Sequence, residues 1–316
     1  MSDFSLTDAA LEGLRITRER PRMILWWWAA WIVATLVCPL ILALPPFRSA
    51  PELIPEFVTA QGAAMAHPGD TGAYQRAVDL MSRVAPALFA LYGFFILAQL
   101  LVSTAVLRAV LRPAERSLGA LRLSLDELRQ VGLAAMILVA LFAYFIVVGV
   151  VISGILAALG AGPSSAISTL AAPVLMLWAV AYPAVRLSLA PAMTLADGRI
   201  SFLRAWSLTK GLFAPLLGAY AIALAIAFAL YFAVSQPVAM ALELAGWHPT
   251  PTLVVDLKSL ASPFVLVQLA VGALLHALLS AILVAPAASA FRQITGRVGA
   301  PAPQPEPNAS TGSPWG

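Results

Sequence analysis

Arg199-Ile-Ser-Phe-Leu-Arg-Ala-Trp-Ser-Leu-Thr-Lys-Gly211 leads directly into an apolar run at residues 212–234, and this arrangement recurs in the chain. Two further stretches, Leu11-Glu-Gly-Leu-Arg15 and Leu118-Gly-Ala-Leu-Arg122, align without gaps with Ile200-Ser-Phe-Leu-Arg204. Each of the three lies a few residues before a run that is long enough to cross a bilayer. We call these three stretches the elbows, and we predict that each forms a basic helix on the membrane surface that leads into a spanning helix.

The composition is that of a membrane protein. Of the 316 residues, 61% are hydrophobic and 11% are charged, and the mean hydropathy is +0.89, which lies outside the range of soluble globular domains. The single cysteine, Cys38, excludes a disulfide framework and a cysteine-based metal site, and its place in an apolar run favours a small core residue. Arginine supplies 17 of the 19 basic residues, which we interpret as genomic base composition, so no nucleic-acid partner is expected.

Six apolar runs have the length of membrane-spanning helices. They cover about residues 23–44, 84–107, 131–159, 167–189, 212–234 and 263–291. The sequence therefore predicts an all-α polytopic membrane protein whose six transmembrane helices form three parallel hairpin repeats, each preceded by a cytoplasmic interfacial elbow helix. The predicted repeat units are about 8–111, 112–197 and 198–298, and together they form a single membrane domain, 1–298. The tail, 299–316, is rich in Pro, Ala, Ser and Gly and is predicted to be disordered.

The second elbow has the cleanest amphipathic pattern. Across residues 112–130, leucines recur at helical spacing at positions Leu118, Leu121, Leu125 and Leu128. Residues 71–83 also have helical spacing, and we expect them to lie along the surface before the second span. The fourth span contains Pro183 and is followed by Pro191, which predicts a kinked or interrupted end.

Basic residues are unevenly divided between the two predicted sides of the membrane. The side with the N-terminal arm, the elbows and the C-terminal tail carries 15 lysines and arginines, whereas the opposite side carries 4. By the positive-inside rule, both termini are predicted to be cytoplasmic.

Three stretches carry a resemblance to a known group of proteins. They are Arg186-Leu-Ser-Leu-Ala-Pro191, Leu203-Arg-Ala-Trp-Ser-Leu-Thr-Lys-Gly211 and Ala290-Phe-Arg-Gln-Ile-Thr-Gly296. With them the chain resembles bacterial six-helix membrane proteins, including the membrane domain attached to some bacterial glycerophosphodiester phosphodiesterases. The resemblance implies a multi-pass protein of the bacterial inner membrane. The catalytic barrel of those phosphodiesterases would need about 250 further residues, so hydrolysis is not expected to carry over.

Polar side chains within the spans form one candidate cluster. Its members are Gln99, Ser103, Gln268, His276 and Ser280. They could line a proton or substrate path. Alternatively, the groups on the sixth span hydrogen-bond to Gln99 and Ser103 on the second, each bond contributing about 0.6 kcal/mol. We favour the structural interpretation, because the six runs contain no carboxylate, the usual partner in a proton relay.

The elbows supply the other candidate residues. Arg15, Arg122, Arg204 and Lys210 could contact anionic head groups or act only as signals for topology. The sequence shows no Gly-rich phosphate loop, paired carboxylates or nucleophile elbow, so neither an enzyme nor a cofactor is predicted. We expect a non-enzymatic membrane protein with an envelope, assembly or lipid-associated role. Membrane lipids, a membrane-protein partner or a second copy of the chain would be its partners, and a small-molecule or lipid transporter is the alternative.

Overall fold

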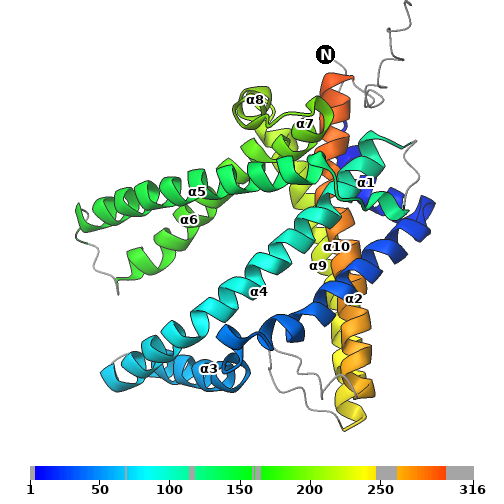
Figure 1. Cartoon of the computed structure of the whole chain (residues 1–316). Coiled ribbons are helices and arrows are strands. Elements are labelled where there is room, and N and C mark those ends of the chain that lie inside the picture. Colours follow the sequence, from blue (N-terminus) through cyan, green and yellow to red (C-terminus); the bar gives the residue numbers. More distant parts are fainter. Residues whose placement is uncertain are drawn as a thin grey trace, which may run out of the picture. The chain divides into compact units, whose positions relative to one another are not determined.

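The computed structural model describes residues 4–67, 70–113, 118–158, 160, 165–246 and 262–296, and all regular structure within them is helical (Figure 1). Six segments of this part are long and apolar enough to cross a membrane, as predicted. They are α2 (Pro21–Leu42), α4 (Thr71–Leu111), α5 (Leu125–Ala158), the segment Ala171–Asp197 that covers most of α6 (Ala166–Leu187) together with α7 (Ala190–Asp197), α9 (Phe213–Leu244), and α10 (Pro263–Thr295). The predicted tail, 299–316, lies outside the described residues.

The remaining described helices are shorter. They are α1 (Leu6–Glu19), the 3-10 turn η1 (Pro45–Phe47), α3 (Ala50–Ala66), the 3-10 turn η2 (Leu118–Ala120), and α8 (Phe202–Leu208).

Proline has different effects in different spans. α4 and α9 extend beyond the predicted spans, and Pro86 and Pro237 lie inside them. A proline removes one backbone hydrogen bond, which a spanning helix can tolerate. Near Pro191 the span is interrupted: α6 ends at Leu187, and Pro191 lies in the first turn of α7, where the missing proline N–H breaks no helix hydrogen bond.

The three elbows differ in structure. The first is α1, a helix of 14 residues, and the third contains α8, which has 7 residues. In the second elbow, residues 118–124 contain only the turn η2, where Gly119 and Ala120 have φ values of 67° and 60°. A right-handed helix cannot pass through two left-handed residues, so helix structure resumes only at Leu125, although the spacing predicted it across 112–130. The three parallel hairpin repeats stay a prediction.

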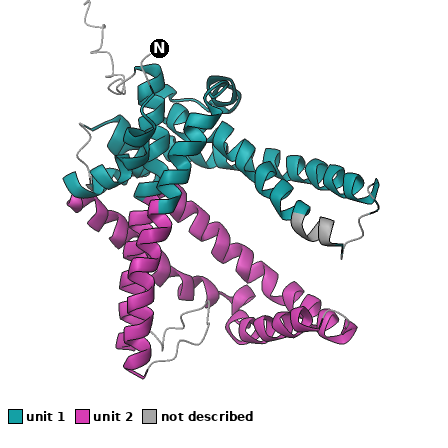
Figure 2. Ribbon diagram, turned by 180° about the vertical axis from the view of Figure 1, so that it is seen from behind, with its two compact units in different colours: residues 1–19, 103–225, 281–316 teal, residues 20–102, 226–280 magenta. Residues whose placement is uncertain are grey.

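The chain divides into two compact units (Figure 2). Unit 1 comprises residues 1–19, 103–225 and 281–316, and unit 2 comprises residues 20–102 and 226–280. The three elbows all belong to unit 1. Because α4, α9 and α10 each contribute residues to both units, the units do not follow the boundaries of the predicted repeats.

Unit 2 has an apolar core between α2, α3 and α4. Its buried members are Leu42, Ala50, Ile54, Val84, Ala87 and Leu91. Two tryptophans of α2 add contacts to other helices of the unit: Trp31 stacks on Phe95 with ring centroids 6.3 Å apart, and Trp28 Nε1 donates a hydrogen bond to the Ala270 carbonyl at 2.8 Å. Aromatic packing and a hydrogen bond thus join α2 to α4 and α10.

In unit 1, α1 lies against α10 with almost no space between the backbones. A Cβ atom placed on Gly13 would lie 2.5 Å from the Ala281 carbonyl oxygen and 2.6 Å from the Ile282 Cα. The Ser5 N–H also donates to Gln293 Oε1 at 2.9 Å. The predicted surface elbow is therefore packed on a spanning helix through its glycine.

The α5–α6 hairpin belongs to unit 1 (Figure 2), and many of its large apolar side chains are exposed. None of the side chains in the most apolar stretch of α5 is buried within the protein. Phe142 and Val150, for example, are each 69% exposed. A surface of this kind requires an apolar environment, which the hydrocarbon core of a bilayer provides.

Candidate functional site

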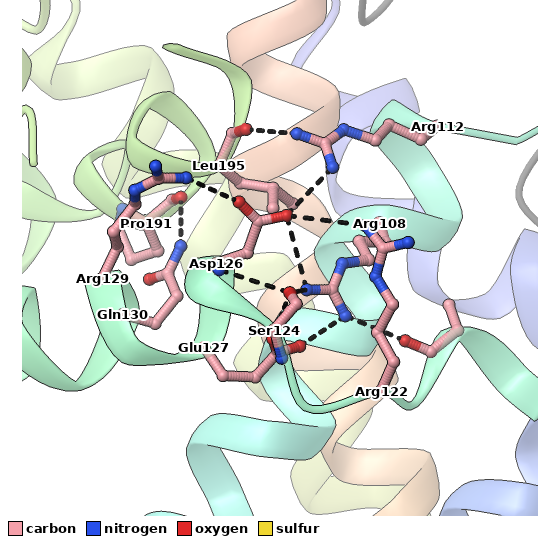
Figure 3. A network of polar contacts seen from close by, with 11 residues as sticks. Arg108, Arg112, Arg122, Ser124, Asp126, Glu127, Arg129, Gln130, Pro191 and Leu195 are labelled. Carbon is pink, nitrogen blue, oxygen red and sulfur yellow. Dashed lines mark hydrogen bonds and ion pairs between the residues drawn. The ribbon is translucent and has the colours of Figure 1, made fainter. Parts of the chain in front are cut away.

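Charged side chains gather in unit 1 where α4 ends and α5 begins (Figure 3). Arg108, near the end of α4, is fully buried, and it forms ion pairs with Glu127 at 2.5 Å and with Asp126 at 3.5 Å. Arg112 contacts Asp126 at 3.0 Å. Arg108 near the end of α4 and Arg112 just beyond that helix thus meet two carboxylates in the first turn of α5. We call this group the arginine–carboxylate network.

The local sequence positions both carboxylates. Ser124 precedes α5, and its backbone N–H and hydroxyl donate to Glu127 Oε2 at 2.8 Å and 2.6 Å. The Ser124 hydroxyl also accepts the Asp126 N–H at 3.3 Å. Ser-x-x-Glu is the pattern of a capping box, and the positive end of the helix dipole favours carboxylates in the first turn. The same residues therefore start α5 and present two anions to α4.

The network also holds the turn of the second elbow. Arg108 donates from Nη1 to the Ala120 carbonyl and from Nη2 to the Ser124 hydroxyl, each at 3.1 Å. These bonds stabilise a turn in which Ala120 has a positive φ, a conformation unfavourable for a residue with a Cβ atom. The buried guanidinium of Arg108 thus offsets part of the energetic cost of the positive φ angle in this turn.

Further contacts connect the network to α7. Arg112 Nη2 donates to the Leu195 carbonyl at 2.7 Å, and Gln130 Nε2 donates to the Pro191 carbonyl at 2.8 Å (Figure 3). Pro191 is the second residue of α7, so Gln130 bonds a carbonyl in the first turn of that helix. The ends of α4, α5 and α7 are therefore connected through polar side chains.

The arginine–carboxylate network holds the ends of these helices together. Both carboxylates are held by guanidinium groups, so neither is placed as a free acid or base. Removing one partner of a buried ion pair leaves an uncompensated charge and costs about 3–5 kcal/mol. Within the described residues, no group of three or more His, Cys, Asp and Glu side chains could hold a metal ion.

The structure joins two members of the predicted intramembrane cluster. The Ser280 hydroxyl donates to Gln99 Oε1 at 3.4 Å, as the structural interpretation expected. His276 Nδ1 lies 2.9 Å from the Gly272 carbonyl of its own helix, and its ring lies 5.0 Å from that of Trp31. Gln268 is exposed, and Ser103, one turn beyond Gln99 on α4, is half-buried.

The elbow arginines are exposed and paired. Arg15 forms an ion pair with Glu12, Arg122 lies 3.8 Å from Asp126, and Arg204 lies 2.6 Å from Asp197. Their side chains are between 42% and 51% exposed. Exposed pairs contribute about 0–1 kcal/mol, and a guanidinium has five N–H donors, so such a group can still bind a phosphate. Lys210 is also exposed.

The sequence interpretation missed the buried network, although one signal pointed to it. Ser124-Leu-Asp-Glu127 is a capping box that could have placed the start of α5 after the turn. No comparable signal distinguishes Arg108 from the exposed arginines, because its burial depends on how α4 and α5 pack. When the chain is compared with known proteins, no family model, curated protein or solved structure matches it.

Proposed function

We propose that this chain is a non-enzymatic multi-pass protein of the bacterial cytoplasmic membrane with a lipid-associated role, in which the elbows of unit 1 bind anionic head groups. Both termini lie in the cytoplasm, and partner proteins or further copies of the chain assemble with it in the plane of the membrane.

The distribution of charge supports this proposal most directly. Unit 1 contains 13 of the 19 basic and 9 of the 15 acidic residues, whereas unit 2 contains six of each. The whole formal excess of +4 therefore belongs to the unit that contains the three elbows. Basic residues beside a spanning helix gain about 1 kcal/mol each near an anionic leaflet.

The surroundings of the elbows fit the same role. Arg15, Arg204 and Lys210 are exposed, so their charged groups can reach a ligand. The exposed apolar face of α5 in the same unit requires lipid beside it. A head group and its acyl chains would then meet basic and apolar surfaces of a single unit.

Lipid analysis of matched variants tests the proposal. The triple variant Arg15→Gln, Arg204→Gln, Lys210→Gln removes three exposed charges from unit 1. Its control, Arg48→Gln, Arg76→Gln, Arg83→Gln, removes three exposed charges from unit 2. Each protein is exchanged into mixed phosphatidylglycerol and phosphatidylcholine micelles, and the retained lipids are quantified by mass spectrometry.

At about 1 kcal/mol for each charge, affinity of the elbow variant for phosphatidylglycerol should fall by about 100-fold. The control should retain the wild-type ratio of the two lipids. Equal retention by the wild type and the elbow variant, or an equal loss in both variants, would remove the basis for the proposal.

The orientation is tested separately. A phosphatase reporter that is active only in the periplasm, fused after Gly296, should be inactive, because the positive-inside rule places the basic side in the cytoplasm. Activity of that fusion would reverse the proposed orientation. Transport is less well supported, since in the described residues the polar side chain of His276 bonds its own helix and Ser280 bonds Gln99.

A further inference from the structure

A second buried arginine in unit 1 has surroundings unlike those of Arg108. Arg186 lies in the last turn of α6 and is 9% exposed. Its guanidinium carbon lies 5.9 Å from the ring centroid of Tyr182, one turn earlier on α6, and 5.1 Å from that of Trp206 on α8. Two aromatic rings therefore flank the cation.

Thr209 connects this arginine to the end of α8. The fully buried Thr209 hydroxyl lies 3.0 Å from the Arg186 carbonyl and accepts a hydrogen bond from Arg186 Nη1 at 3.4 Å. The hydroxyl also lies 3.0 Å from the Ala205 carbonyl, so it has several acceptors for its single proton. Both the backbone and the side chain of Arg186 are thus positioned by α8.

The Arg186 guanidinium lacks a counter-charge in the part of the chain that the structure describes. Arg108 has ion pairs with two carboxylates, whereas Arg186 has none there. Its Nε is buried and has no hydrogen-bond partner. Of the five N–H donors of the group, one makes the 3.4 Å bond to Thr209.

Burial removes water from the Arg186 guanidinium, and the contacts described above replace only part of the lost hydration. Contacts with aromatic faces recover part of the solvation that the guanidinium loses, but they satisfy none of its in-plane donors. A phosphate oxygen provides both the missing negative charge and acceptors that match the planar fork of arginine.

The neighbouring rings indicate the depth at which a ligand would bind. Tyr182 and Trp206 are 40% and 36% exposed, and their rings meet edge to face at 5.7 Å. Trp178 stacks on Phe213 at 5.6 Å, and Phe213 in turn contacts Tyr182 at 5.5 Å. Tryptophan and tyrosine collect where the hydrocarbon core of a bilayer meets the head groups, which is the level of lipid phosphates.

We propose that Arg186 binds a phosphate group beside Tyr182 and Trp206. This inference rests on the proposed function in one respect, since a lipid head group is one source of the phosphate. Free inorganic phosphate is the other source. The site differs from the exposed elbow residues, because its arginine is buried and enclosed by rings.

The test measures ligand-dependent thermal stability of the purified full-length protein in a phosphate-free detergent. Three probes are titrated: inorganic phosphate, short-chain phosphatidylglycerol, and a diacylglycerol of the same chain length that lacks phosphate. Arg186→Met keeps most of the side-chain length and removes the charge. Arg83→Met, at an exposed arginine of unit 2 outside the elbows, is the matched control.

We expect phosphatidylglycerol, phosphate or both to raise the Tm of the wild type and of Arg83→Met, and diacylglycerol to have no comparable effect. In Arg186→Met the apparent Kd for the active probe should rise at least about tenfold, because a charge-assisted pair of hydrogen bonds is lost. A response to phosphatidylglycerol alone would identify a lipid site, and a response to phosphate alone would identify a site for the soluble anion.

Arg186→Lys provides a second variant that keeps the charge without the planar fork. It should bind with an affinity between those of the wild type and Arg186→Met. Equal probe responses in the wild type, Arg186→Met and Arg186→Lys, or no response in any of them, would overturn the inference. A response that depends on Arg186 would stand even if the elbow triple variant retained all its lipid, so the two proposals can fail independently.

Discussion

Replacing Gly13 with alanine should push α1 away from α10. The added Cβ would lie 2.5 Å from the Ala281 carbonyl oxygen and 2.6 Å from the Ile282 Cα, whereas ordinary contacts lie at 3.4–4 Å. Both neighbours are backbone atoms, so neither can rotate away. The two helices must separate by about 1 Å, which strains the packing of a close-packed protein interior.

Two opposing effects set the magnitude. Overpacking of this kind costs about 1–3 kcal/mol. Alanine is favoured over glycine in a helix interior by about 1 kcal/mol, which offsets part of that cost. Separation would also lengthen the bond from the Ser5 N–H to Gln293 and the 3.6 Å ion pair between Arg292 and Glu12. We expect Gly13→Ala to lower the free energy of unfolding by about 1–2 kcal/mol.

The control is Gly62→Ala in α3, where an added Cβ meets no atom within 4 Å. Only the gain in helix propensity remains there, so this variant should be as stable as the wild type or up to about 1 kcal/mol more stable. Unfolding by SDS in mixed micelles, followed by tryptophan fluorescence, measures both differences. The close approach of α1 and α10 would be refuted if Gly13→Ala matched or exceeded the stability of the wild type.

Three further changes test individual contacts by the same SDS titration. Glu127→Gln should lower stability by about 3 kcal/mol, because Arg108 then keeps only the longer pair with Asp126; a loss below 1 kcal/mol would contradict the buried pair. Thr209→Val should cost about 1–3 kcal/mol by removing the hydroxyl between α6 and α8, while Thr209→Ser should retain most of the stability, and equal losses would argue against the hydrogen bonds. Trp28→Phe removes the 2.8 Å bond to α10 and should cost about 1 kcal/mol, so unchanged stability would show that this bond contributes nothing.

The second elbow shows which features a sequence pattern can predict and which depend on tertiary structure. Its leucine spacing predicted one apolar helix face across 112–130, but of these leucines only Leu125 and Leu128 lie in α5, where each is 66% exposed. Asp126 and Glu127, which an interfacial helix would turn toward water, are each only 8% exposed. Periodicity defines two faces but cannot say whether the polar face meets water or other polar side chains, since both environments satisfy its charges.

The sequence by itself determined the class of the protein and its six spans. Crossing about 30 Å of hydrocarbon takes about 20 apolar residues, and this requirement is local in the chain. Only the tertiary structure decided which charges are buried. Arg108 and Arg15 look equivalent in sequence, yet the first is fully buried and the second is exposed. The difference arises because burial of a charge depends on the carboxylates, carbonyls and rings that distant segments bring to it, and those segments meet only when the helices pack.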